Sequence, residues 1–379
     1  MVLYPYIGYP LILCLMDRLA RMTRSSMPFR RGEDAPDDRW LKVSLLISVY
    51  NEEKIIERKM ENTLLLDYPG DRLEILVVSD GSTDRTDEIV SRYRERGVQL
   101  RNYAGRIGKT ACLNRTIPTA AGEIIVFSDA NSEYPKNALK NLVRHFRNPS
   151  IGFVTGTTRY RSQETSEGEG TIGIYARFER FLKLMESSLG FCVGADGAIF
   201  AIRKTLYLPL ADHDINDFVI PLSIIRHGSK GIVDGDAYCF EDAAENIQGE
   251  YQRQVRITAR TLGAIFNNAD LLNPFRYKYF SFFLFSHKIC KLAGPLFIFL
   301  YVLSNLVLLG EGWIYQVSGV ALIVVAGSAV VPSLFPRKPF SPKLLEIARE
   351  FLFINAAYLA GWFSFIRKKN VTTWNPIRK

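Results

Sequence analysis

Cysteine is scarce in this chain, and its cysteines form no CxxC pair. The five are Cys14, Cys112, Cys192, Cys239 and Cys290. Structural zinc sites and disulfide frameworks need cysteines at close or regular spacing, so neither organises this fold. We interpret these cysteines as reduced or membrane-buried small residues.

Two other familiar signals lack their required context. Gly168-Glu-Gly-Thr-Ile-Gly173 matches GxGxxG, but no strand precedes it. That motif binds a dinucleotide only between a strand and a helix, so we treat the match as a coincidence. No basic segment precedes the apolar residues Val2 to Met16, and no small-residue cleavage site follows them. A secretory signal peptide is therefore not expected.

Positive charge exceeds negative charge, with a formal net charge of +9. No recognised nucleic-acid-binding motif accompanies it, so we expect no nucleic-acid partner. The basic residues instead gather beside apolar stretches, as is typical of a cytoplasmic membrane face. They are Arg18, Arg21, Arg24, Arg30 and Arg31 after the first stretch, and Lys288, Lys291, Arg337, Lys338 and Lys343 beside the later ones.

Apolar stretches lie at both ends of the chain. The first has about 15 residues, short of the ~20 that span a bilayer, so it lies partly in the interface or is a shortened spanning helix. Three further spans are predicted at Leu292–Leu309, Trp313–Phe335 and about Leu344–Ile366. Four spans would put both termini on one side, whereas Arg367-Lys-Lys369 favours a cytoplasmic C-terminus. These inferences conflict, and the side of the C-terminus stays open.

Between these ends the pattern alternates strand and helix, which predicts an α/β fold with a mostly parallel sheet and helices on both faces. The strands are expected at 43–50, 73–78, 99–103 and 123–128, and the helices at about 52–65, 84–96 and 110–120. Further extended stretches at 152–160, 198–202 and 232–240 continue the domain, with helices at 173–189, 216–226 and 250–267. A polar loop is expected over 162–170.

Polar residues follow the ends of three predicted strands. They are Tyr50-Asn-Glu-Glu53, Ser79-Asp-Gly-Ser-Thr-Asp84 and Asp129-Ala-Asn131. Ligands of open α/β sheets bind beyond the carboxyl ends of the strands, so a nucleotide site is the leading hypothesis. A plainer interpretation makes Asp80 a turn former and Asp84 a carboxylate at the start of a helix.

In order and spacing, these motifs together resemble the inverting family 2 glycosyltransferases with a GT-A fold. The membrane-bound branch of that family includes cellulose, hyaluronan and poly-N-acetylglucosamine synthases. The resemblance runs from about Tyr9 to Trp374. It implies that Tyr50, Asn51, Glu52, Asp80 and Asp84 bind the uridine of a UDP-sugar, and that Lys109 of Gly105-Arg-Ile-Gly-Lys109 approaches the diphosphate.

The resemblance also implies a metal site and a general base. Asp129 and Asn131 occupy the DxD position, where Asp129 would hold Mg²⁺ or Mn²⁺ and Asn131 is the weaker, neutral ligand. Asp217 would deprotonate the acceptor hydroxyl. The nearby Asp212-His-Asp214 is better explained by solvated loop residues than by a metal site.

Three further positions resemble the acceptor side of the family's site. Asp196 lies in a turn of that kind, and Arg253 and Arg256 fall where processive synthases carry Q-x-x-R-W. Ile257 replaces the tryptophan, which weakens the case for a tightly held polymer. An ordinary basic helix face remains the alternative for the arginines.

We therefore expect an integral protein of a bacterial inner (plasma) membrane with a cytoplasmic catalytic domain. Its parts would be an anchor helix (1–23), a linker (24–41), a GT-A domain (42–268), an interfacial segment (269–290), transmembrane helices (291–366) and a basic tail (367–379). It would transfer sugar to a growing polysaccharide through a β-linkage; the alternatives are transfer to a membrane lipid and a catalytically silent subunit. An export or accessory subunit would be a further partner.

Overall fold

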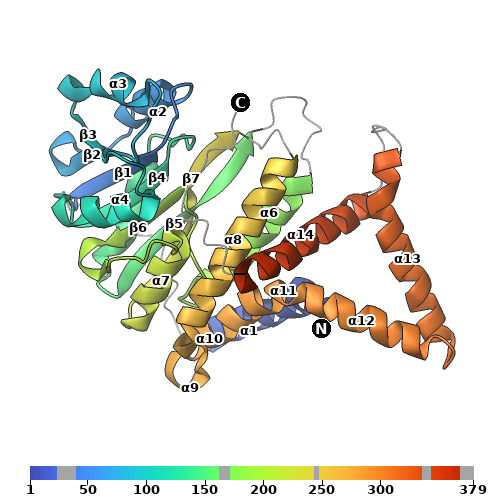
Figure 1. The fold of residues 1–379 in the computed structure, drawn as a ribbon. Coiled ribbons are helices and arrows are strands. Elements are labelled where there is room, and N and C mark those ends of the chain that lie inside the picture. The colour runs from blue at the N-terminus through green and yellow to red at the C-terminus, as the bar shows by residue number, and fades with distance from the viewer. Residues whose placement is uncertain (24–39, 162–170, 243–246, 335–342, 368–379) are drawn as a thin grey trace.

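A seven-stranded sheet in the order β3-β2-β1-β4-β6-β5-β7 forms the centre of the computed structural model (Figure 1). The structure describes residues 1–23, 40–161, 171–242, 247–334 and 343–367. The expected loop 162–170, and nearly all of the expected linker and basic tail, lie outside the described residues.

The strands agree closely with the predicted ones. They are β1 (Val43–Val49), β2 (Leu73–Ser79), β3 (Val98–Asn102), β4 (Ile124–Asp129), β5 (Ile151–Arg161), β6 (Ile199–Arg203) and β7 (Lys230–Asp242). β1 is buried throughout because both faces of the sheet are covered, which explains its unbroken apolar sequence.

The direction of one strand was not predictable. β1 pairs in parallel with β2 and β4, but β6 runs antiparallel to both of its neighbours, β4 and β5. The sheet is therefore mixed, although most of its pairs are parallel. A short apolar run looks the same in either direction, so the sequence pattern could not reveal the reversal.

Helices cover both faces of the sheet, as predicted. Along β1, Leu45 and Ile47 belong to one core and Leu46 to the other. The first core includes residues of α2 (Ile56–Leu64), α3 (Thr86–Ser91) and α5 (Ala138–Val143). The second includes residues of α4 (Lys109–Thr116), α6 (Thr171–Ser188), α7 (Asn216–Arg226) and α8 (Ile247–Asn267).

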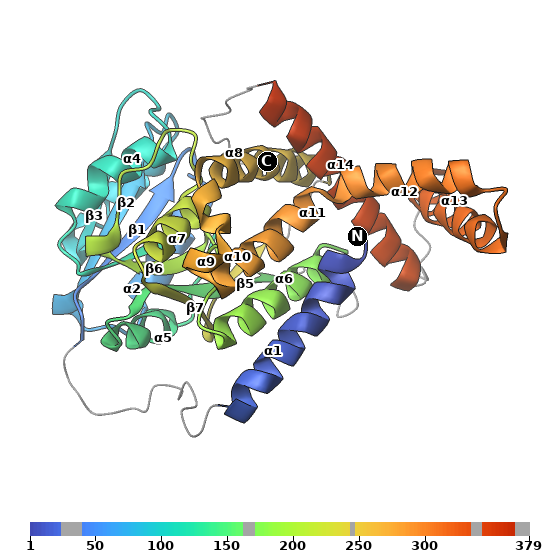
Figure 2. The same cartoon turned by 90° about the horizontal axis from the view of Figure 1, so that it is seen from below.

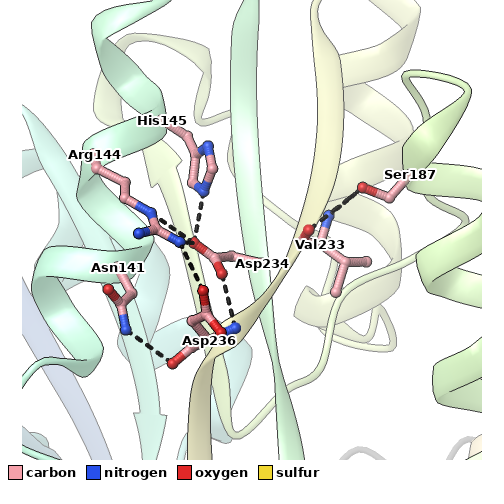
Figure 3. Close-up of polar contacts among 7 residues, drawn as sticks. All are labelled: Asn141, Arg144, His145, Ser187, Val233, Asp234 and Asp236. Atoms are coloured by element: carbon pink, nitrogen blue, oxygen red, sulfur yellow. Dashed lines mark hydrogen bonds and ion pairs between the residues drawn. The ribbon is translucent and has the colours of Figure 1, made fainter. Parts of the chain in front are cut away.

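A bulge in β7 is pinned by the helical segment that follows β4 (Figure 3). The buried Asp234 carboxylate accepts hydrogen bonds from His145 Nε2 at 2.6 Å and Arg144 Nε at 3.0 Å. Burial alone would raise the pKa of Asp234, but the His145 bond, the Asp236 N–H and the Arg144 charge hold it below its usual range. On the other side of β7, Val233 N–H donates to Ser187 Oγ of α6 at 2.8 Å. These contacts fix the strand whose far end reaches the candidate site.

The C-terminal apolar runs form helices, but their crossing of a membrane is not confirmed. The helices are α9 (Pro274–Tyr277), α10 (Tyr279–Phe283), α11 (Cys290–Leu292), α12 (Gly294–Leu308), α13 (Trp313–Leu334) and α14 (Lys343–Ile366). Over the described residues, no helix taken singly has both the length and the apolar composition of a span. The stretches Tyr279–Leu292 and Gly294–Leu308 meet those criteria only as a pair, bent by 59°.

The N-terminal helix α1 (Tyr9–Thr23) packs against α6 through a buried polar network (Figure 2). We call Tyr9, Glu179, Glu186, His287 and Lys291 the His287 network. His287 Nδ1 lies 2.6 Å from Glu186 Oε1 and Nε2 lies 2.9 Å from Glu179 Oε2. Tyr9 donates to Glu186 at 2.6 Å, and Lys291 pairs with Glu179. The network ties the segment around His287 to both helices.

Replacing His287 with alanine should destabilise the protein by about 1–3 kcal/mol, because it removes one hydrogen-bonding partner from each of two carboxylates in a buried network. His287 is fully buried, whereas His227 is exposed on the turn after α7, where its ring contacts Ser223 O. His227→Ala is therefore the matched control, with an expected change near zero. Thermal unfolding of the purified protein measures both. Equal melting temperatures for the two variants would contradict a supporting role for the network.

Candidate functional site

The carboxyl ends of β1, β2 and β4 lie side by side. Ser48 of β1 is in register with Asp129 of β4, and Val49 is in register with Ser79 of β2. This register brings Tyr50, Asp80 and Asp129 to one edge of the sheet, as the strand-end pattern predicted.

The segment after β1 is bound to the turn after β2. Asn51 has a φ of 51°, in the left-handed region that asparagine tolerates better than most residues. Its Oδ1 accepts the Thr83 N–H at 2.8 Å, and its own N–H donates to Ser82 Oγ at 3.2 Å. The Tyr50 ring lies beside this turn and stacks under the Arg106 guanidinium, 3.8 Å from the ring centroid. Asn51 thus shapes the loop, and Tyr50 offers one flat face.

Asp84 has the role of a carboxylate at the start of a helix. Its Oδ1 accepts from Thr86 N and Thr86 Oγ1 at 3.0 and 2.6 Å, and its Oδ2 accepts the Glu53 N–H at 3.1 Å. Burial acts to raise the pKa of Asp84, but these hydrogen bonds outweigh it and lower the pKa. Glu52 is buried beside it, and its N–H donates to Thr86 Oγ1 at 2.7 Å.

Asp84→Ala should therefore lower stability by about 1–3 kcal/mol, because it removes the acceptor of the Thr86 N–H, the Thr86 hydroxyl and the Glu53 N–H. The control is Glu88→Ala in α3, which removes only an exposed ion pair with Arg92. Thermal unfolding compares them. An unchanged melting temperature together with lost nucleotide binding would instead assign Asp84 a direct contact with the nucleotide.

Asp80 links β2 to the beginning of α4. The buried carboxylate accepts the Gly108 N–H at 2.8 Å, and the Cys112 thiol lies 3.5 Å from the same oxygen. This contact places the next residue, Lys109, at the edge of the sheet. Lys109 Nζ then pairs with Asp129 Oδ1 at 2.7 Å, where each side chain is about a quarter exposed (26% and 29%). Lys109 therefore faces the acidic end of β4.

The ligand set around Asp129 suits a divalent ion that is shared with a phosphate. No group of three or more His, Cys, Asp or Glu side chains able to hold a metal occurs in the described part of the chain. Mg²⁺ is commonly bound by one or two carboxylates plus substrate phosphates rather than by an all-protein cage. The Asp129 carboxylate and the Asn131 amide oxygen, in the turn after β4, fit that second arrangement.

Asp217 lies in the first turn of α7 and is partly buried. A Cβ atom at Gly197 would lie 2.9 Å from Asp217 Oδ2, so the neighbouring turn leaves room for the carboxylate only because residue 197 is glycine. Burial raises the pKa of Asp217. The positive charges of Lys109 and Lys183 oppose this rise, and the negative charges of Asp129 and Asp196 add to it. Asp217 thus shares one electrostatic environment with Asp129 and Lys109.

Asp196 mainly supports the backbone near this environment. Its Oδ2 accepts the Thr158 N–H at 2.8 Å, and its Oδ1 accepts the Thr158 hydroxyl at 2.9 Å. The turn between α6 and β6 is thereby attached to β5. These bonds occupy both oxygens, so Asp196 acts on the site through its charge and its position.

The two predicted arginines differ in their acidic neighbours. Arg253 interacts with both Glu250 and Glu241, whereas the acidic neighbour of Arg256 is Glu250. Arg253 bonds Glu250 on its own helix at 3.2 Å, and its charge lowers the pKa of Glu241. Arg256 is largely buried, and burial together with the positive charges of Arg260 and Arg253 lowers its pKa. Arg260, which was not predicted, is coupled electrostatically to Asp217.

Sequence reasoning also missed Glu241 and Lys183. Glu241 is the twelfth residue of β7 and accepts from Ser132 Oγ at 2.6 Å. Burial and the neighbouring Asp129 raise the pKa of Glu241 to about 7. Glu241 could have been predicted as a site residue, because it directly follows the predicted strand 232–240 and polar residues at strand ends mark the ligand edge. Lys183, which donates to Ala195 O at 3.1 Å, sits on a helix that the sequence marked only by its apolar positions.

The chain resembles a solved structure over almost its whole length. The mannosyltransferase PcManGT of Pyrobaculum calidifontis, solved in complex with GDP-Man and Mn²⁺, aligns with 97% of this chain and 97% of its own, with a TM-score of 0.72 and 21% identity. That likeness shows a GT-A fold. Residues 44–207 match the model "Glycosyl transferase family 2", and this part of the chain belongs to that family.

Two curated relatives match in sequence. The beta-monoglucosyldiacylglycerol synthase of Synechocystis sp. is 35% identical over 139 residues, covering 36% of this chain and 29% of that protein. The poly-beta-1,6-N-acetyl-D-glucosamine synthase of Staphylococcus aureus is 24% identical over 223 residues, covering 56% and 53%. The match therefore spans about half or less of each relative's length.

Proposed function

We propose that the protein is an inverting glycosyltransferase that moves a sugar from a UDP-sugar to an acceptor hydroxyl at a membrane surface. The observation that carries this proposal is the convergence of Lys109, Asp129 and Asp217 at the carboxyl edge of the sheet. A transferase of this kind needs a cation near the leaving diphosphate and a base near the acceptor.

In the proposed reaction the acceptor hydroxyl attacks the anomeric carbon while the bond to the diphosphate breaks. The Asp217 carboxylate accepts the hydroxyl proton, and UDP departs with the bonding electrons. Single displacement inverts the configuration, so an α-linked donor yields a β-linked product. Lys109 and Arg253 place positive charge where negative charge develops on the departing nucleotide.

The donor would lie over the segments after β1 and β2. Tyr50 offers its ring to the uracil, and the loop fixed by Asn51, Glu52, Asp80 and Asp84 surrounds the uridine. A divalent ion, Mg²⁺ or Mn²⁺, would be held by Asp129 and Asn131 together with the diphosphate. That ion supplies Lewis-acid stabilisation of the leaving group.

We infer that the acceptor is a growing polysaccharide and keep a membrane lipid as the second candidate. Both kinds of product appear in the names of the matched relatives. Ile257, in place of the tryptophan of processive synthases, favours the lipid. Arg253, Arg256 and Asp196 lie on the expected acceptor side and are compatible with either product.

Incubating the purified protein with labelled UDP-sugars in lipid vesicles tests this proposal. Release of UDP with transfer of sugar supports it, and chromatographic product length separates a polymer from a glycolipid. No transfer from any UDP-sugar to either acceptor class, despite measurable nucleotide binding, would favour the catalytically silent subunit.

We place the enzyme in a bacterial inner membrane with its catalytic domain in the cytoplasm. The exposed apolar side chains of α12 and α13 support this placement. They include Leu296, Phe299, Leu303, Leu306, Val307, Trp313, Ile314, Val317, Val320 and Ile323. Resistance to salt extraction from membranes tests the placement independently of activity.

A further inference from the structure

The last helix, α14, packs against the catalytic domain, although the sequence pattern predicted a spanning segment there. Its buried residues Ile354, Ala357 and Tyr358 form one face of the helix. Beyond them, Phe365 stacks on Phe266 of α8 with ring centroids 5.3 Å apart. The two helices pack against each other (Figure 1).

The contact between α14 and α8 is close as well as extensive. A Cβ atom at Gly361 would collide with the Thr258 side chain, so only glycine allows this approach. Trp362 Nε1 also donates to Leu292 O at 2.8 Å, which attaches α14 to the beginning of the hairpin formed by α12 and α13. The position of α14 is therefore determined by the position of α8.

α8 itself belongs with the active site. It carries Glu250, Arg253, Arg256 and Arg260, and it is amphipathic along its whole length. The Arg253 charge reaches Glu241, and that of Arg260 is coupled to Asp217. Placing arginine side chains in the hydrocarbon core of a bilayer is energetically costly. The interactions of Arg253 with Glu241 and of Arg260 with Asp217 also require α8 to lie beside the candidate site. A helix packed along α8 therefore also lies outside the hydrocarbon core.

The outer face of α14 is apolar. Ala356, Leu359, Phe363 and Ile366 are exposed and recur at spacings of three and four residues. Arg349 and Glu350 lie in the second turn of this helix, and Arg367 follows its last residue. α14 also contacts α12, whose exposed side chains are apolar. A helix with one exposed apolar face and charged residues near both of its ends is compatible with the membrane interface.

We propose that α14 lies along the membrane surface on the catalytic side and that, after the catalytic domain, only the α12–α13 hairpin enters the bilayer core. This rests on the proposed membrane location but not on the proposed reaction. Two crossings return the chain to the side it left, so the C-terminus shares the side of the catalytic domain. Three crossings would have placed the basic Arg367-Lys-Lys369 outside. The conflict left by the sequence thus disappears.

Thiol labelling in sealed membrane vesicles of both orientations tests this arrangement. The background carries Cys14→Ser, since Cys14 is exposed and the other four cysteines are buried. Single cysteines replace exposed Glu95 in the catalytic domain, Glu311 at the hairpin tip and Arg367 after α14. We expect an impermeant reagent to label positions 95 and 367 from one side and position 311 from the other. Labelling of position 367 together with position 311 would overturn the proposal.

A cross-link tests the packing directly. Phe266→Cys with Phe365→Cys should be joined by a short bifunctional thiol reagent in native membranes, because these two rings stack with centroids 5.3 Å apart. Phe266→Cys with Phe363→Cys on the outer face should not be joined. Failure of the first pair, or equal cross-linking of both, would contradict the packing.

A spin label at Phe363 should report contact with lipid. A water-exposed label, or one immobilised between protein copies, would reject the lipid surface as partner. Equal labelling of positions 95, 311 and 367 in both vesicle orientations would instead reject the membrane location itself.

Discussion

Replacing Asp217 with asparagine should lower the rate of sugar transfer by about 10²–10⁴-fold, the usual contribution of a general base. Donor binding should change little, because Asp217 lies in the first turn of α7, away from the loops that would surround the uridine. The matched control is Asp212→Asn, which changes an exposed carboxylate five residues earlier in the chain. Transfer assays and nucleotide-binding measurements on both variants check the expectation. Near-normal turnover in Asp217→Asn would assign the base to another residue.

The pH profile gives an independent test of Asp217. A base works only when it is ionised, so the rate should rise as pH increases through the raised pKa of Asp217. The Lys183 charge opposes that rise in pKa. Lys183→Met should therefore shift the acidic limb of the profile to higher pH while the maximal rate is largely kept. An unshifted limb would show that Lys183 does not influence the base.

Removing divalent ions should abolish transfer, and Asp129→Ala should weaken both metal and donor binding. The physical reason is the charge on the leaving diphosphate, which needs a cation held by Asp129. Glu133→Gln is the control, because that carboxylate is already paired with Arg58 and Arg161. Metal titrations followed by donor binding and by turnover measure the effect. Full activity in excess chelator would contradict the metal requirement.

Asn131→Asp extends the same test. If residue 131 faces the ion, the added negative charge should tighten metal binding and lower the metal concentration needed for half-maximal activity. An unchanged metal requirement would leave Asp129 as the protein's ligand and remove Asn131 from the site.

The sequence by itself determined the order of the elements and most of the acidic positions in the site. Buried strands in this region are continuous apolar runs, and polar residues at their ends mark the ligand edge, so Asp80 and Asp129 could be placed from local pattern. The start of α7 was also predicted correctly, with Asp217 in its first turn. These features depend on neighbours in the chain.

Only the tertiary structure decided how those residues are used. The carboxylates of Asp84 and Asp196 accept backbone hydrogen bonds. The bond from Gly108 N–H to Asp80 positions Lys109, which then pairs with Asp129. Glu241, Lys183 and Arg260 reach the site from strands and helices remote in sequence. Likewise, hydropathy did not show that one face of α14 packs against α8. Contacts between distant segments depend on packing in three dimensions, and local composition does not record which face of an element meets which partner.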